Sequence, residues 1–118
     1  ATLSFTSNGG QYGQNGGSAV VEGTSLKNAT SVAIELVGGY KVNDMITAEA
    51  GLGYNADKSS ATGKKNDGQM CIYGQATINL ADGFFVVPEI GLIDYMDDAN
   101  GNTEGKIMYL AAKWQMSF

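Results

Sequence analysis

Residues 105–118, GKIMYLAAKWQMSF, decide how this chain folds. Large apolar side chains recur at every second position of this stretch, and the charged Lys113 falls between them. A period of two is that of an extended strand whose two faces differ. One predicted face carries Met108, Leu110, Ala112, Trp114, Met116 and Phe118, and the other carries Tyr109, Ala111, Lys113, Gln115 and Ser117.

Four further segments alternate in the same way and predict an all-β chain, folded as an antiparallel meander. They are residues 31–42, 45–56, 70–80 and 84–97. In each of them one face is expected to be free of charge. Pro88 cannot donate a ladder hydrogen bond, so a bulge or an edge position is expected in its strand. Residues 18–23 and 1–7 add one or two less regular strands, which brings the expected total to six or seven.

The connections between these segments alternate in length. Residues 43–44 and 81–83 are expected to form tight hairpin turns. Residues 58–68 and 98–104 are expected to form long polar connections, with 24–30 as a shorter third. Alternating short turns and long loops are typical of outer-membrane barrels. Residues 8–17 form a Gly/Asn/Gln tract that fits a loop, a bulged strand pair or a constriction segment.

The composition favours a β protein that faces something other than water. Charged residues make up 16% of the chain, against about 25% in ordinary domains. No apolar run approaches the roughly 20 residues of a spanning helix, so any membrane crossing needs strands of about 9 to 11 residues. The net charge of −5 argues against nucleic acid as a partner. Cys71 is the only cysteine and has no partner for a disulfide or a zinc site.

Three stretches resemble the C-terminal half of Gram-negative general porins, in particular those of metal- and sulfate-reducing deltaproteobacteria. They are VAIELVGGYKVNDMITAEAGLGYNADK (32–58), VVPEIGLIDYMDD (86–98) and YLAAKWQMSF (109–118), and the likeness covers about residues 31–118. It implies a transmembrane β-barrel of the bacterial outer membrane, in contact with lipid, that lets ions or small solutes diffuse. It also implies that the last strand carries an assembly signal formed by Trp114, Met116 and Phe118.

The size of the chain departs from that family. A water-filled porin takes about 16 to 18 strands, so this chain is expected to supply part of a barrel completed by a parent chain or by other copies in a homo-oligomer. Two alternatives stay open. The chain could be a structural protein that assembles through its open sheet edges, or a soluble or cell-surface β-sandwich that binds ligands through its long loops.

Catalysis is not expected, because the chain has no histidine and no nucleophile or phosphate-loop motif. If the chain is a single porin-like unit, with an irregular part over residues 1–30 and hairpins over 31–118, the polar strand faces line the lumen and their charges bias ion passage. The predicted pore-lining residues are Glu35, Lys41, Glu49, Tyr73, Gln75, Glu89 and Lys113. The acidic loop 97–104 has the oxygen content of a calcium loop, but a solvated loop is favoured. No cofactor or metal is expected.

Overall fold

The protein is described by a computed structural model of residues 1–7 and 17–117. These residues form strands and connections without a helix, and no helix among them could span a membrane. The strands are β1 (Thr2–Ser7), β2 (Val20–Glu22), β3 (Ser25–Lys27), β4 (Ala29–Lys41), β5 (Ile46–Ser59), β6 (Asn66–Ala81), β7 (Phe84–Asp94) and β8 (Lys106–Met116). The tract 8–16 and Phe118 lie outside the described residues.

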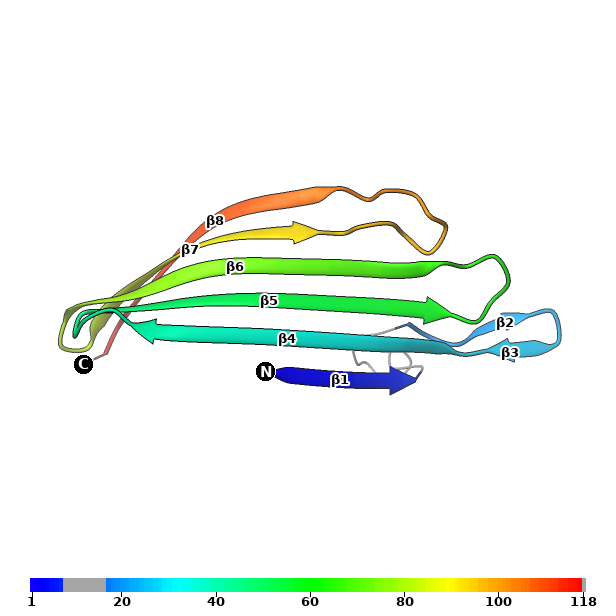
Figure 1. The fold of residues 1–118 in the computed structure, drawn as a ribbon, viewed down its shortest axis with the longest axis horizontal. Coiled ribbons are helices and arrows are strands. Elements are labelled where there is room, and N and C mark those ends of the chain that lie inside the picture. The colour runs from blue at the N-terminus through cyan, green and yellow to red at the C-terminus, as the bar shows by residue number, and fades with distance from the viewer. Residues whose placement is uncertain (8–16, 118) are drawn as a thin grey trace.

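Six of these strands form one antiparallel sheet in the order β1-β4-β5-β6-β7-β8 (Figure 1). From β4 onward each strand pairs with the next one in the sequence, which is the arrangement of a meander. The remaining two strands, β2 and β3, form a separate hairpin. The prediction of an all-β antiparallel meander is therefore confirmed, and the sheet is open, with β1 at one side and β8 at the other.

Short and long connections lie at opposite ends of the sheet (Figure 1). At one end the chain turns sharply after β4 and after β6. Asn43 begins the first turn by accepting hydrogen bonds at its side-chain oxygen from the backbone N–H groups of Met45 and Ile46, at 2.9 and 2.8 Å. The second turn needs Gly83, whose φ is 74°. At the other end, called here the loop end, lie the longer connections 60–65 and 95–105 and the β2–β3 hairpin.

Two local predictions differ from the structure. The expected connection over residues 24–30 is wrong, because β3 and the first residues of β4 occupy most of it. Pro88 lies in an interior strand and pairs in register with Ala112. The register shift falls instead between Asn79 and Ala81, one strand away. On the β6 side the ladder skips Pro88 and Val87 and resumes at Val86 opposite Ile78, so the missing amide donor of Pro88 falls where no pair forms with β6.

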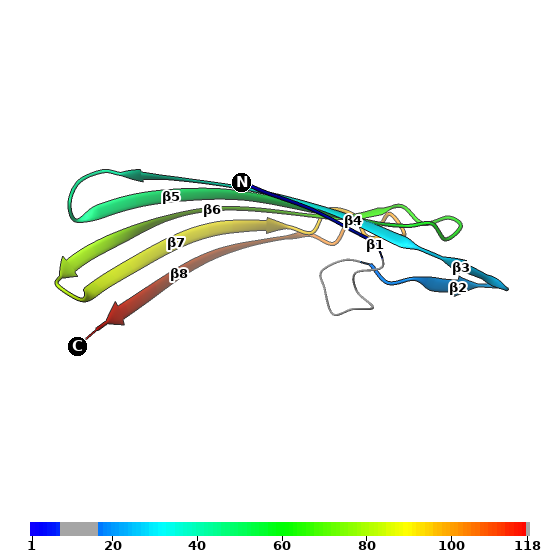
Figure 2. The same cartoon turned by 90° about the horizontal axis from the view of Figure 1, so that it is seen from below.

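The described part of the chain has almost no hydrophobic core. Ala29 is its only buried apolar residue, and it contains no large side chain that is fully enclosed. The accessible surface is 8073 Å², well above the roughly 6,100 Å² expected for a compact monomer of this mass. Figure 2 shows why: the sheet is a single bent layer, and no second layer covers either of its faces.

Candidate functional site

The register of the sheet divides its side chains by residue number. Directly opposed residues point to the same side of a sheet. Leu36, Leu52, Ile72, Leu92 and Met108 face one another in sequence across five strands. Even-numbered residues of β4 to β8, up to Ile78 in β6, therefore share one side, called the apolar face. Odd-numbered residues share the other side, called the polar face.

Large side chains of the apolar face are exposed in the isolated chain. Leu110 is 83% exposed and Trp114 73%. Trp114 and Met116, two members of the predicted assembly signal, both lie on this face, opposite Val86 and Phe84. The third member, Phe118, lies outside the described residues. The apolar face is thus a continuous hydrophobic surface. A surface of this kind is unfavourable in contact with water and marks a site of interaction with a membrane or another protein.

One charged pair contradicts the prediction that this face is free of charge. Asp94 lies on the apolar face opposite Lys106, at the loop end of β7 and β8. The Lys106 ammonium nitrogen is 2.7 Å from Asp94 Oδ2. The two charges are tolerated there because they pair with each other where the strands leave the sheet.

The polar face carries all seven residues predicted to line a pore. Register arranges them in cross-strand rows two residues apart, or about 7 Å along the strands. Lys41 and Lys113 share a row near the turns with Thr47, Thr77 and Val87. Glu49, Gln75 and Glu89 are directly opposed in the next row. Tyr73 lies in the third row, and Glu35 lies in the fourth.

Glu49 is held by two neutral donors from β6. The Tyr73 hydroxyl donates to Glu49 Oε1 at 2.9 Å, and the Gln75 side-chain amide donates to the same oxygen at 2.7 Å. Tyr73 reaches this position because its ring lies flat across Gly51, where any Cβ would collide with ring atoms. An aromatic side chain that covers a strand glycine is a known way to fix register.

A second copy of this arrangement lies two strands further on. The Tyr109 hydroxyl donates to Glu89 Oε1 at 2.7 Å, and the Tyr109 ring covers Gly91 as Tyr73 covers Gly51. Tyr109 and both glycines were not among the predicted site residues. The signal was present in the sequence as a repeated Glu-Xaa-Gly, at 49–51 and at 89–91, each followed in the next strand by a tyrosine on the same face.

The two lysines of the polar face point away from these carboxylates. Lys41 is 2.7 Å from Asp44 Oδ1 in the adjacent turn. The Lys113 ammonium lies 5.5 Å from the centroid of the Phe85 ring, within the range of a cation–π contact. Other than Lys41–Asp44, the ion pairs of the described residues join Lys27 to Glu22 and Lys106 to Asp94. Glu49 and Glu89 therefore have no cationic partner in this part of the chain.

A hollow of about 620 Å³ lies on the polar face toward the loop end. Its lining includes Thr2 and Ser4 of β1, together with Glu35, Asp57 and Tyr73. Sequence reasoning missed Asp57, which directly opposes a second carboxylate, that of Asp67. Like charges directly opposite each other are unfavourable in a sheet. With Glu35, Glu49 and Glu89, this pair extends the carboxylates of the polar face toward the loop end.

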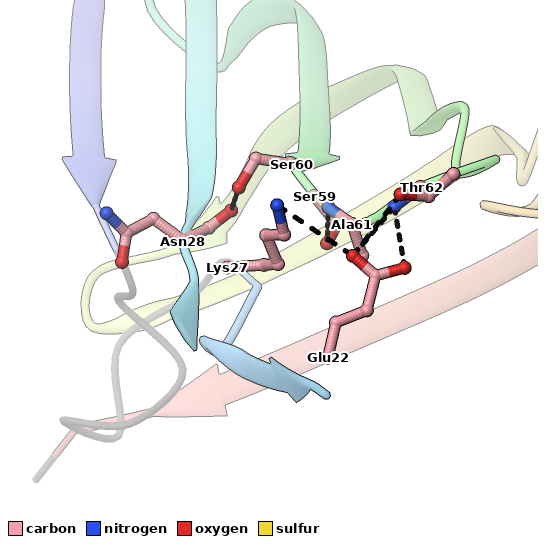
Figure 3. A network of polar contacts seen from close by, with 7 residues as sticks. All are labelled: Glu22, Lys27, Asn28, Ser59, Ser60, Ala61 and Thr62. Carbon is pink, nitrogen blue, oxygen red and sulfur yellow. Dashed lines mark hydrogen bonds and ion pairs between the residues drawn. The ribbon is translucent and has the colours of Figure 1, made fainter. Parts of the chain in front are cut away.

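Hydrogen bonds tie the β2–β3 hairpin to the connection after β5 (Figure 3). Glu22 accepts hydrogen bonds from the backbone N–H and the hydroxyl of Thr62, each close to 3.3 Å. The backbone carbonyl of Asn28 accepts from the Ser60 hydroxyl at 2.8 Å. Lys65 extends the network by donating its backbone N–H to Ala99 at 2.8 Å. The connections of the loop end are thus joined to one another by hydrogen bonds.

The acidic loop 97–104 is organised by its own hydrogen bonds. Asp98 Oδ1 accepts from the backbone N–H groups of Asn100 and Asn102, both at 2.8 Å. Hydrogen bonds from Asn102, and then from Asn100, hold the pKa of the Asp98 carboxyl well below its usual range. No cluster of three or more metal-binding side chains forms within residues 1–7 and 17–117.

Comparison with protein-family models, with curated proteins and with solved structures gives no match for this chain. The likeness to Gram-negative porins consequently stays a prediction that rests on the residues quoted above. The class that the fold and the two faces define is an open, single-layered, antiparallel β-sheet with one apolar and one charged face.

Proposed function

We propose that this chain is a segment of a transmembrane β-barrel in the bacterial outer membrane. In this role it forms part of the wall of a passive diffusion channel for ions or small solutes. Its apolar face contacts lipid, and its polar face lines the lumen. The remaining strands of the barrel come from a parent chain or from other copies in a homo-oligomer.

One observation carries this proposal: no described part of the chain covers the apolar face. A soluble β-sandwich buries its apolar face against a second sheet, and the described residues supply no such sheet. Lipid can cover the apolar face of a single-layered sheet, provided that its strands are long enough to cross the bilayer. β4 to β8 contain between 11 and 16 residues each, and about 9 to 11 suffice for a crossing.

The polar face supports permeation of cations in preference to anions. Glu35, Glu49 and Glu89 lie within it, and none of them forms an ion pair with a described residue. Carboxylates on the wall of a passage attract cations and repel anions. Their effect is strongest where low-dielectric surroundings reduce screening.

A second candidate function is supported by the edges of the sheet. β1 pairs with β4 only over residues 30–35, so residues 36–41 of β4 have β5 on one side and no described strand on the other. The far side of β8 is equally open. Open edges are templates for pairing with another strand. If intact chains alone assemble into a uniform filament or multi-chain barrel that carries no current, the protein is structural.

Conductance of the complete assembly in a planar bilayer tests the first proposal. Replacing Glu35, Glu49 and Glu89 together by glutamine should reduce the ratio of cation to anion permeability at low salt. The difference should shrink near 1 M salt, where the Debye length falls to about 3 Å. An assembly without any current, or a selectivity indifferent to these three carboxylates, would contradict the channel proposal.

A further inference from the structure

Each of the two hydrogen-bonded carboxylates has a lysine as a diagonal neighbour. Glu89 opposes Ala111 of β8, so Tyr109 and Lys113 lie on its two diagonals. Side chains on such diagonals are roughly 7 to 8 Å apart at the backbone, within reach of long side chains. Glu89 could therefore pair with the ammonium group of Lys113. It accepts a hydrogen bond from Tyr109 instead, on the opposite diagonal.

Glu49 likewise contacts neutral donors although a lysine is its diagonal neighbour. It opposes Gly39 of β4, which makes Lys41 one of its diagonal neighbours. Its contacts are to Tyr73 and Gln75 on β6, while Lys41 pairs with Asp44. Both carboxylates thus lean away from the row of lysines, and both lysines lean toward the turns.

The repeated tyrosine–glutamate hydrogen bond points to an arrangement that keeps opposite charges apart. We propose that Tyr73 and Tyr109 are positioning residues, which hold the Glu49 and Glu89 carboxylates away from Lys41 and Lys113. This inference rests on the proposed channel function. The wall then presents a negative row at one depth and the charge of Lys113 at another, where ion pairs with the lysines would have neutralised the two carboxylates. Gly51 and Gly91 are part of this arrangement, because only a residue without Cβ leaves room for each tyrosine ring to reach its carboxylate.

Tyr109→Phe tests the positioning role of Tyr109, since phenylalanine keeps the ring over Gly91 and removes only the hydroxyl. Glu89 is then free to swing toward Lys113 and neutralise it. In a bilayer with a potassium chloride gradient, the reversal potential of Tyr109→Phe should shift toward zero, which reports a loss of cation selectivity. In a Lys113→Gln background the same substitution should produce no shift. An equal shift in both backgrounds would overturn the proposal.

Tyr54→Phe is the matched control, because Tyr54 lies on the apolar face and its substitution should not move the reversal potential. A second readout does not need a conducting channel. In protein refolded in detergent, the ¹⁵N resonance of the Lys113 ammonium should change in Tyr109→Phe, and Glu89→Gln should abolish that change.

The two readouts separate the two claims. An assembly that carries no current but shows this NMR change disproves the channel and retains the positioning role. A Lys113 resonance that does not respond to Tyr109→Phe, with or without current, disproves the positioning role.

Discussion

Leu110→Arg should destabilise the protein severely if the apolar face contacts lipid. Leu110 lies near the middle of β8, opposite Ile90, and 83% of its surface is exposed in the isolated chain. In water, a substitution at so exposed a position would cost little. At the midplane of a bilayer, arginine on the lipid-facing side of a barrel costs about 2 to 4 kcal/mol.

That cost corresponds to a loss of roughly 30- to 700-fold in the ratio of folded to unfolded protein. Urea titration of the assembly in lipid vesicles, followed by the fluorescence of Trp114, measures the change. Trp114 suits this purpose because it is the only tryptophan in the chain.

Ala111→Arg is the matched control, one residue away on the same strand. Ala111 lies on the polar face directly opposite Glu89, so arginine there gains a favourable cross-strand charge pair worth about 0.2 to 1 kcal/mol. It should leave stability unchanged or raise it slightly. If both arginines are tolerated equally, or if Ala111→Arg is the more damaging, the assignment of the two faces to lipid and lumen is wrong.

Two further predictions concern the loop end. Lys106→Gln should lower stability by leaving Asp94 without its 2.7 Å partner, and adding Asp94→Asn should restore it; urea titration that finds the double variant less stable than Lys106→Gln contradicts this. The hydrogen bonds to Asp98 lower its pKa, so the order that they confer on its loop is fully present above the ordinary aspartate pKa of about 4 and is lost progressively as pH falls from there through the lowered pKa. The amide proton shift of Asn102 should therefore titrate in acid and stay constant in Asp98→Asn; a titration retained in the variant would assign the effect to another group.

The facing of the long strands could be predicted from the sequence because parity is a local property. Once a strand is recognised, the period of two decides which residues share a face. Continuous pairing through Leu36, Leu52 and Ile72 then preserves that parity from strand to strand. Tight turns of fixed length are what keep the register from slipping.

The β2–β3 hairpin was predicted only in part: β2 lies within the strand expected over residues 18–23, whereas β3 falls in the expected connection 24–30. Its strands have three residues each, and all but one of the six are exposed, so no alternation of apolar and polar positions marks them. Contacts such as that of Glu22 with Thr62 depend on a connection 40 residues away. The sequence of residues 24–30 alone does not indicate that contact.

The candidate site was predicted in its composition but not in its geometry. Glu49 and Glu89 were identified as lumen residues because they fall at polar positions. Which neighbour each carboxylate contacts depends on the direction in which Tyr73 and Tyr109 lean, and this depends on glycines in the adjacent strands. Such a preference becomes visible only when the register between strands is known.

The proposed channel wall requires that the apolar face lie against lipid. Trp114 lies on that face and is a natural reporter of it. Lipids with brominated acyl chains quench a tryptophan that touches them, and aqueous iodide quenches one that faces water. Moving the tryptophan by one residue, with Trp114→Phe and Gln115→Trp together, transfers the reporter to the polar face.

In vesicles, Trp114 should be quenched strongly by the brominated lipid and weakly by iodide. The variant with its tryptophan at position 115 should show the reverse. If brominated lipid leaves the fluorescence of Trp114 unchanged while iodide quenches it, the apolar face does not contact the bilayer and the proposed channel wall is excluded.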